Sequence, residues 1–236
     1  MNKNNWAKHW KNRLHEYQTP LSIPRAGLYI ASHFKDIKTS LEIGCGSARD
    51  SIYLASKGIK VSACDYEPWL IDTLKEKYKD SPINFFEADA FNLQLSDKSF
   101  DLVFNNQVFI YYDNDNDIIT MLKEHARITS KYLLIFVNHT KNQRLEEQFE
   151  QKGKSDPVFK TRFFDIAEFE KLLHLSGIQY KEVKFFKFGG KADILFMKII
   201  KRIPNIFYPF RKQLIPRLYK FQPWNRTERL GVLIKF

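Results

Sequence analysis

A glycine-rich turn and an acidic residue that follows it are the most informative features of the sequence. Residues 41–50 read LEIGCGSARD, in which Gly44 and Gly46 let the backbone bend tightly and approach a ligand without a Cβ in the way. Asp65 follows Gly44 by 21 residues and ends the next apolar run. A carboxylate at that place can accept hydrogen bonds from the hydroxyls of a ribose. The pair therefore predicts a site for a nucleoside-type cofactor.

The third position of a dinucleotide-binding fingerprint argues against NAD as that cofactor. The pattern GxGxxG needs a third glycine for close packing of helix on strand, and this chain has Arg49 there. An NAD-dependent oxidoreductase, or a cofactor-binding scaffold without catalysis, is therefore kept only as an alternative of another class.

Strands and helices alternate around these residues. Short apolar runs predict strands over residues 39–43, 59–64, 83–87, 100–105 and 132–137, and the segments 48–57, 68–78 and 117–128 between them have helical patterns. A helix capped by Asp165 and two further strands over 178–188 and 230–236 follow. Strands joined by helical crossovers are typical of a parallel sheet covered on both faces.

Four segments, in this order and spacing, resemble the successive motifs of class I S-adenosylmethionine-dependent methyltransferases: LEIGCGSARD, VSACDYEP, FFEADAFNL and FDLVFNNQVFIYY. The resemblance covers residues 39–138 strongly and 160–188 weakly. It implies S-adenosyl-L-methionine as the cofactor. It also implies a Rossmann-like, doubly wound α/β fold of three layers, with a seven-stranded sheet that is mostly parallel and has an antiparallel last strand.

The same resemblance implies which residues bind the cofactor. These are Glu42, Gly44, Cys45 and Gly46 at the methionine end, Asp65 at the ribose hydroxyls, Tyr66 against the adenine, Asp89 and Ala90 at the edge of the adenine ring, and Asn106 near the methionine portion. Two positions depart from the family pattern. Ala48 stands in place of a third glycine, and residues 128–131 replace the usual Pro-Gly-Gly before the fifth strand.

Transfer of a methyl group to a hydroxyl requires a base within reach of the hydroxyl proton. The predicted catalytic residues are His139, after the fifth strand, and Tyr111, after the fourth; His139 is favoured because an imidazole titrates near neutral pH. Arg25 and Arg162 are candidate contacts for an anionic substrate. The remaining histidines are predicted to be structural or exposed, and their spacing indicates no metal site: His9, His15, His33, His125 and His174.

An aromatic helix is predicted over residues 3–17, with Trp6, Trp10 and Tyr17 on one face. It belongs to a helical cap over residues 1–38, ahead of a cofactor-binding domain over 39–190. Two interpretations remain open: the helix covers the cofactor as a lid, or it simply packs on the sheet.

The positive charge of the chain is concentrated near its end. The formal net charge is +11, but residues 191–236 hold 11 Lys and Arg against two acids, a balance of +9, so the preceding body is nearly neutral. Residues 191–203 have the pattern of a basic amphipathic helix. We therefore expect a basic insertion over 191–227 and a final strand over 228–236 that returns to the sheet.

Three functions of the basic insertion are considered: contact with a membrane surface through 191–221, stacking on single-stranded RNA, or packing of its apolar residues over the pocket or against a second copy of the chain. Membrane contact is favoured, because no signature of a modular RNA-binding fold is present. The predicted function is O-methylation of a small or lipid-linked acceptor of saccharide or isoprenoid type, with RNA methylation as the alternative.

Cellular location is predicted from what the chain lacks. No apolar run reaches the ~18 residues of a membrane span, and the first residues are too polar for a signal peptide. Two cysteines, Cys45 and Cys64, are too few for a disulfide framework and are predicted to be small packing residues. We expect a cytoplasmic protein, peripheral on the inner face of the membrane.

Overall fold

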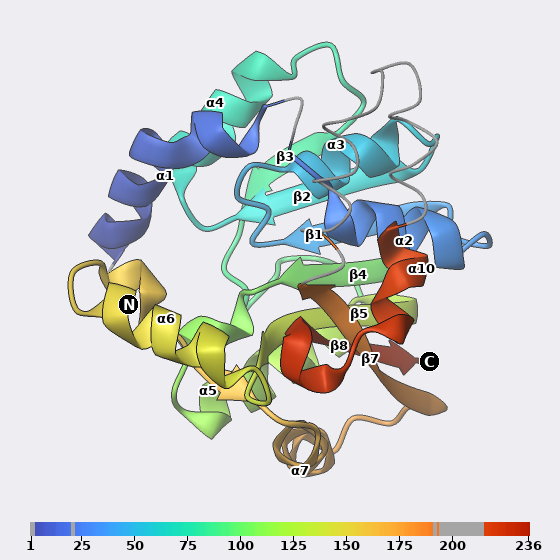
Figure 1. Cartoon of the computed structure of the whole chain (residues 1–236). Coiled ribbons are helices and arrows are strands. Elements are labelled where there is room, and N and C mark those ends of the chain that lie inside the picture. The colour runs from blue at the N-terminus through green and yellow to red at the C-terminus, as the bar shows by residue number, and fades with distance from the viewer. Residues whose placement is uncertain (1–2, 20–21, 191–192, 194–214) are drawn as a thin grey trace.

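An eight-stranded sheet forms the centre of the molecule (Figure 1). The computed structural model describes residues 3–19, 22–190, 193 and 215–236. Seven strands lie in the order β3-β2-β1-β4-β5-β8-β7, and β6 pairs with β5 beside this path. The strands are β1 (Thr39–Ile43), β2 (Lys60–Asp65), β3 (Asn84–Glu87), β4 (Phe100–Asn106), β5 (Thr129–His139), β6 (Phe163–Phe164), β7 (Glu182–Gly190) and β8 (Thr227–Lys235).

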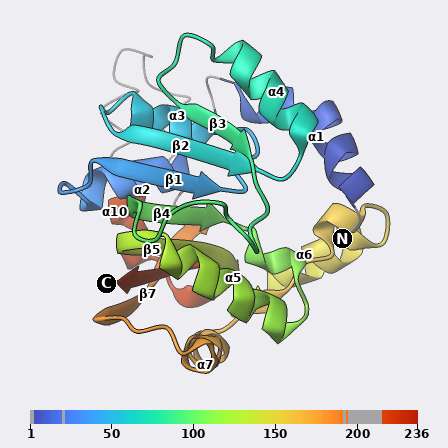
Figure 2. The same cartoon turned by 180° about the vertical axis from the view of Figure 1, so that it is seen from behind.

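Helices cover both faces of the sheet (Figures 1 and 2). On one face, Leu134 and Phe136 of β5 share a core with helices α2 (Arg25–His33), α3 (Arg49–Ala55) and α4 (Pro68–Lys77). On the other, Leu133 and Ile135 share a core with helices α5 (Asp115–Arg127) and α7 (Ile166–Ser176). Successive residues of a strand point to opposite faces, which is why the apolar run YLLIFV serves both cores. This confirms the doubly wound, three-layer fold.

The last strand returns to the sheet in the opposite direction from its neighbours. β8 lies between β5 and β7 and pairs antiparallel with both, with Leu230 opposite Val137 on one side and Lys187 on the other. Gly231 faces the ring of Phe186, which would lie 2.4 Å from an added Cβ. The antiparallel final strand is thus confirmed. The two-residue β6 brings the number of described strands to eight, one more than predicted.

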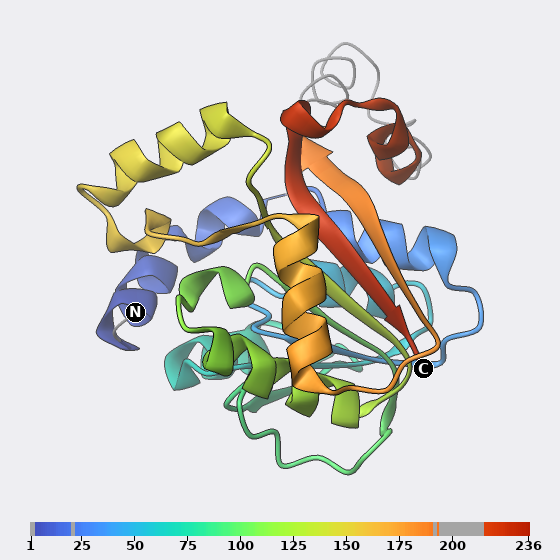
Figure 3. The same cartoon turned by 90° about the horizontal axis from the view of Figure 1, so that it is seen from below.

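Two elements that the sequence analysis did not predict lie beside the start of helix α1 (Lys3–Tyr17), as Figures 1 and 3 show. They are helix α6 (Gln143–Gly153) and the 3-10 turn η2 (Pro157–Phe159). The side chain of Asn142 accepts a hydrogen bond from the backbone N–H of Leu145 and caps α6; Asp156 caps η2 in the same way. Both elements help to form the pocket described below.

The basic segment is described only in part. The predicted helix over 191–203 lies outside the described residues, apart from Asp193. The chain is described again from α10 (Ile215–Leu218) through two 3-10 turns, η4 (Tyr219–Phe221) and η5 (Trp224–Arg226). Tyr219 packs into the first core. Among the helices of the described residues, none has the length and apolar character needed to cross a bilayer.

Candidate active site

In the glycine turn after β1, every second residue has a left-handed backbone conformation. Gly44 has φ +66°, Gly46 +51° and Ala48 +54°. A Cβ added to Gly44 would lie 2.4 Å from a methyl group of Val108, so the position has room only for glycine. Ala48 is buried, and its left-handed backbone conformation carries a small strain. Glycine avoids this strain, which explains why the family that the sequence resembles usually has glycine there.

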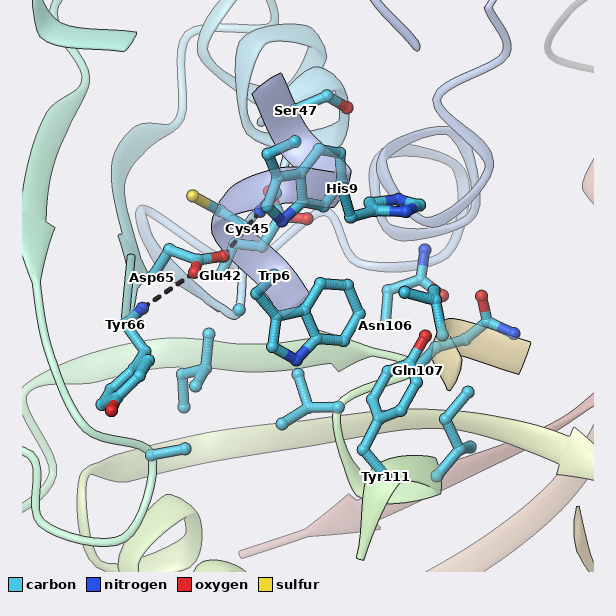
Figure 4. Close-up of a pocket in the computed structure, with 18 of the residues that line it drawn as sticks. Trp6, His9, Glu42, Cys45, Ser47, Asp65, Tyr66, Asn106, Gln107 and Tyr111 are labelled. Atoms are coloured by element: carbon cyan, nitrogen blue, oxygen red, sulfur yellow. Dashed lines mark hydrogen bonds between the residues drawn. The ribbon is translucent and has the colours of Figure 1, made fainter. Parts of the chain in front are cut away.

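Asp65 ties this turn to the end of β2. Its Oδ2 accepts a hydrogen bond from the N–H of Gly46 at 2.9 Å, and its Oδ1 accepts from Tyr66 at 2.8 Å and from Glu67 at 3.2 Å (Figure 4). Burial raises the pKa of Asp65 to about 6, although the backbone donors work in the opposite direction. At neutral pH the carboxylate is ionised and can accept further hydrogen bonds from a ligand.

Glu42 on β1 is a carboxyl of different character. Its Oε2 accepts hydrogen bonds from the N–H and the hydroxyl of Ser51, at 3.1 and 2.5 Å, and so holds the start of α3 against β1. Burial raises the pKa of Glu42 well above its usual range, and the nearby carboxylate of Asp50 raises it further. Both effects favour the protonated form of Glu42.

A cavity of about 470 Å³ joins these residues into one site. Its wall includes every residue that the resemblance assigns to the cofactor, from the ends of β1, β2, β3 and β4: Glu42, Gly44, Cys45, Gly46, Asp65, Tyr66, Asp89, Ala90 and Asn106. The structure thus brings the nine together, as expected where parallel strands end at one edge of a sheet. We call this part of the cavity the cofactor half.

A second part of the cavity wall, which we call the acceptor half, comes mostly from elements outside that edge. Its residues are Trp6, His9 and Arg13 of α1, Gln107, Tyr111 of the 3-10 turn η1 (Phe109–Tyr111), Phe149 of α6, Val158 and Phe159 of η2, and Arg229 of β8. Most of these side chains are aromatic or apolar. The ring centroids of Trp6 and Tyr111 lie 4.7 Å apart in an edge-to-face contact (Figure 4), and those of Phe149 and Phe159 lie 5.5 Å apart.

Helix α1 lies against the cofactor half as well as the acceptor half. The indole of Trp10 covers Gly46 so closely that an added Cβ would lie 2.5 Å from it. The guanidinium of Arg49 lies 5.6 Å from the centre of the Tyr17 ring and donates a hydrogen bond to the hydroxyl of Ser22 at 3.1 Å. The aromatic face of the helix therefore forms a wall of the cavity, and Arg49 helps to hold it there.

Comparison with known proteins identifies the domain. Residues 41–135 match a family described as a methyltransferase domain. This match spans the glycine turn, Asp65, Asp89 and Asn106. The chain carries a class I S-adenosylmethionine-dependent methyltransferase domain.

Curated relatives of the methyltransferase domain differ in what they act on. A ubiquinone biosynthesis O-methyltransferase from Rickettsia felis is 29% identical over 116 residues, which are 48% of this chain and 47% of that protein. A malonyl-[acyl-carrier protein] O-methyltransferase from Ilyobacter polytropus is 35% identical over 77 residues, 31% and 28% of the two chains. The matched region spans about half or less of these relatives.

Solved structures share the fold along nearly the whole chain. A methyltransferase from Archaeoglobus fulgidus superposes with a TM-score of 0.60 at 16% identity, over 97% of this chain and 94% of that one. Magnesium protoporphyrin IX methyltransferase from Synechocystis, with bound S-adenosylhomocysteine, gives 0.57 at 14% identity, over 99% and 86%. At these identities the likeness concerns the fold alone.

The cofactor half of the methyltransferase domain fits S-adenosylmethionine. Gly44 and Gly46 of the turn line the cavity, the ionised Asp65 can accept from ribose hydroxyls, and the cavity has the size of a small-molecule site. Tyr66 and Ala90 line the part beyond Asp65, where the adenine is expected. When bound, the cofactor supplies an electrophilic methyl group on a sulfonium.

The structure does not bring His139 to this site. β5 continues to His139 instead of ending at residue 137, so the imidazole is fully buried within the sheet and is not among the cavity residues. Its Nδ1 lies 3.1 Å from the carbonyl oxygen of Phe164, and its ring contacts Trp224. The expectation that His139 is a base in a loop is thus corrected. Tyr111, the other predicted catalytic residue, does line the cavity.

His9 is the cavity histidine that the sequence analysis overlooked. It lies on α1 and its ring makes edge contacts with Trp6 and Trp10, with ring centroids 5.6 and 5.1 Å apart. Burial lowers the pKa of His9, and Arg13 lowers it further, so the imidazole is neutral at pH 7. The helical spacing of the sequence could have placed His9 at the site. Residues 6, 9, 10, 13 and 17 share one helical face, and all five line the cavity.

The two arginines predicted to contact an anionic substrate are already paired. Arg162 donates to Asp115 and Glu168, both at 2.6 Å, and is not a cavity residue. Arg25 lies in a buried ion cluster with Asp193 and Glu228. The arginine of the acceptor half that is most enclosed is instead Arg229, whose side chain is 7% exposed.

Proposed function

We propose that this chain transfers the methyl group of S-adenosylmethionine to an oxygen atom of a small acceptor bound in the acceptor half. The observation that carries the proposal is the single cavity that joins the two halves. A shared cavity lets cofactor and acceptor meet without crossing water, and positioning of this kind supplies most of the rate enhancement in a one-step displacement.

The lining of the acceptor half favours an acceptor with an apolar or flat body. Trp6, Tyr111, Phe149 and Phe159 offer aromatic faces and edges, which suit a ring, an isoprenoid chain or the apolar face of a saccharide. The curated relatives include O-methyltransferases of two kinds, which supports oxygen as the receiving atom.

We propose His9 as the base that takes the proton of the acceptor hydroxyl. As the neutral imidazole it has a free ring nitrogen to accept that proton. Tyr111 is a weaker candidate for the role, because burial raises the pKa of its hydroxyl and keeps it protonated. The hydroxyl of Tyr111 is better suited to donate a hydrogen bond that orients the acceptor.

Transfer of tritium from S-[methyl-³H]adenosylmethionine to a panel of phenols, isoprenoid alcohols and saccharides tests the proposed function. His9→Gln should reduce kcat by about 100-fold with little change in affinity for S-adenosylhomocysteine, since a general base contributes about that much or more. His15→Gln, which changes an exposed histidine of the same helix, is the matched control and should leave kcat unchanged.

The pH profile separates a base from a structural side chain. Wild-type kcat should fall as the pH is lowered through the depressed pKa of His9, and His9→Gln should lose this dependence. Absence of transfer to every class of acceptor would contradict the proposed function. An unchanged kcat and pH profile in His9→Gln would remove His9 from it.

We further propose that the basic segment 191–221 brings the enzyme to an anionic membrane surface. Support comes from the balance of +9 over residues 191–236, combined with abundant apolar residues. Flotation with vesicles of phosphatidylglycerol and phosphatidylcholine tests this, with Lys198→Glu/Lys201→Glu/Arg202→Glu expected to abolish binding.

Three exposed lysines of the body provide a control with the same change of charge, Lys57→Glu/Lys75→Glu/Lys79→Glu, and this variant should still float. Equal flotation of the two triple variants would contradict membrane contact through the segment. Retention of single-stranded RNA by the wild type, lost only in the variant of the basic segment, would favour the RNA alternative.

A further inference from the structure

Arg229 is a buried cation on the wall of the acceptor half. It lies on β8, with Nη1 donating to the Oδ1 of Asn106 at 2.5 Å and Nη2 3.1 Å from a carboxylate oxygen of Glu228. Its Nε is buried and has no hydrogen-bond partner among the described residues. The Nε is sealed from the cavity, so a ligand in the acceptor half would meet only the part of the Arg229 side chain that lines the wall.

The carboxylate beside Arg229 is shared with another arginine. Arg25 Nη1 lies 2.9 Å from Glu228 and 3.1 Å from Asp193, and Asp193 also accepts a hydrogen bond from the hydroxyl of Tyr219 at 2.8 Å. Burial alone would raise the pKa of Glu228, but the two arginines outweigh it and lower the pKa to about 2. The ion pair with Glu228 therefore holds Arg229 in place, and Arg25 is paired with the same carboxylate.

No carboxylate lines the acceptor half within the described part of the chain. Its charged residues are Arg13 and Arg229, whereas the acids of the cavity wall, such as Asp65 and Asp89, belong to the cofactor half. Arg13 is partly exposed and lies 3.8 Å from Glu16. The charged side chain that faces the enclosed end of the acceptor half is therefore Arg229, with Glu228 paired to it outside the cavity wall.

Arg229 lines the same half of the cavity as Tyr111. Its charge acts on the hydroxyl of Tyr111, which in turn contacts Trp6 edge to face. The Oδ1 of Asn106 accepts from Arg229, and the amide nitrogen of Asn106 carries two N–H donors. Arginine and amide together suit the oxygens of a carboxylate or phosphate.

We propose that Arg229 anchors a carboxylate or phosphate group of the methyl acceptor, and so selects anionic acceptors. The inference rests on the proposed function and adds the substrate class: a small molecule with an apolar body and one anionic group. Arg229 acts by positioning. The anionic end is held at β8, and the body extends along Trp6 and Tyr111 toward His9.

Binding measured by titration calorimetry tests this with a matched pair of probes. On protein saturated with S-adenosylhomocysteine, 3-hydroxybenzoate should bind the wild type about tenfold or more tightly than 3-hydroxybenzamide, as a hydrogen-bonded ion pair would give. Arg229→Gln should remove the preference. Arg226→Gln changes an exposed arginine just ahead of the same strand and should retain it.

Loss of a buried cation can unfold the protein, so a second variant removes both charges of the pair. Glu228→Gln/Arg229→Gln leaves Arg25 matched by Asp193, and it too should bind the two probes equally. Each variant is compared with the wild type in thermal unfolding. Affinity for S-adenosylhomocysteine should change much less than affinity for the benzoate probe in both, because Arg229 reaches the cofactor half only through its hydrogen bond to Asn106.

The carboxylate of the cofactor's own methionine tail has the same chemistry, and a separate arm distinguishes it. If Arg229→Gln weakens S-adenosylhomocysteine but not 5′-methylthioadenosine, which lacks that tail, Arg229 holds the cofactor and the proposal is overturned. Equal binding, or no binding, of the two benzoate probes to the wild type also overturns it. Failure of the proposed function would be seen instead as a lack of methyl transfer by the wild type.

Discussion

The two halves of the cavity differ in how the chain builds them. The cofactor half comes from four successive strand ends, each with its own short motif, and it holds the carboxyl groups of the site. The acceptor half is assembled from α1, η1, α6, η2 and β8, and it is aromatic and positively charged. One half is therefore fixed by local sequence, and the other depends on how distant segments pack.

This difference has a consequence for substitutions. A change in the cofactor half should alter affinity for S-adenosylmethionine whatever the acceptor. A change in the acceptor half should alter acceptor binding and leave cofactor affinity nearly unchanged.

Gly44→Val should have the largest effect, because the new side chain overlaps Val108 and forces a shift of Val108 or of the turn that lines the cavity. We expect affinity for S-adenosylhomocysteine to fall by at least ~100-fold, combined with a strain of about 1–3 kcal/mol from the left-handed backbone. Gly58→Val is the matched control: Gly58 has φ +81° but open space around it. If both variants lose stability equally but only Gly44→Val loses binding, the effect belongs to the cavity.

Asp65→Ala should weaken S-adenosylhomocysteine by about 1–3 kcal/mol, since it removes the acceptor for the ribose hydroxyls and loosens the turn at Gly46. Calorimetry measures this directly. Asp72→Ala removes an exposed carboxylate from α4 and should change nothing. Similar affinities for the two variants would mean that Asp65 only caps its own loop.

Cofactor affinity should also depend on pH through Asp65. Its pKa of about 6 means that most of the carboxyl is protonated at pH 5, and a protonated carboxyl accepts hydrogen bonds poorly. Affinity for S-adenosylhomocysteine should therefore fall about tenfold between pH 7 and pH 5. Asp65→Asn should bind weakly at both pH values. A flat profile in the wild type would contradict the role of the ionised carboxylate.

Phe149→Ala should have the smallest effect and confine it to the acceptor half. Removal of this ring from α6 enlarges the cavity, so acceptor KM should rise by about five- to tenfold, the equivalent of about 1–1.5 kcal/mol of lost aromatic contact. Affinity for S-adenosylhomocysteine should be unchanged. Phe221→Ala is the control, because Phe221 is 75% exposed. Loss of cofactor affinity in Phe149→Ala would break the division between the halves.

The burial of His139, which was predicted to be a base, shows that the end of a strand is difficult to predict from sequence. Residues 132–137 are apolar and were expected to end the fifth strand, but Asn138 pairs with Arg229 and His139 with Phe164 of β6. Backbone pairing with partners far away in sequence lengthened β5 by two residues. The polar residues Asn138 and His139 at the end of the apolar run do not reveal such partners, because the backbone hydrogen bonds between strands do not depend on side-chain type.

The helix over residues 3–17 is the opposite case, because its local spacing was sufficient to predict it. Its aromatic spacing predicted both the bounds of α1 and the face that packs inward. The spacing did not reveal that this face would meet the glycine turn, with Trp10 over Gly46. That contact placed His9 on the cavity wall, where an isolated histidine had been expected to be structural or exposed.

Sequence motifs were sufficient to identify the residues of the cofactor half. Each strand and the turn after it are contiguous, and parallel strands necessarily end at one edge, so short motifs were enough to identify nine residues that line one cavity. Only the tertiary structure decided the acceptor half. Arg229 and Asn106 are 123 residues apart in the chain yet share a hydrogen bond, and α6 and η2 reach the cavity by packing near α1. Contacts of that range follow from burial and from the pairing of β8, which no local pattern records.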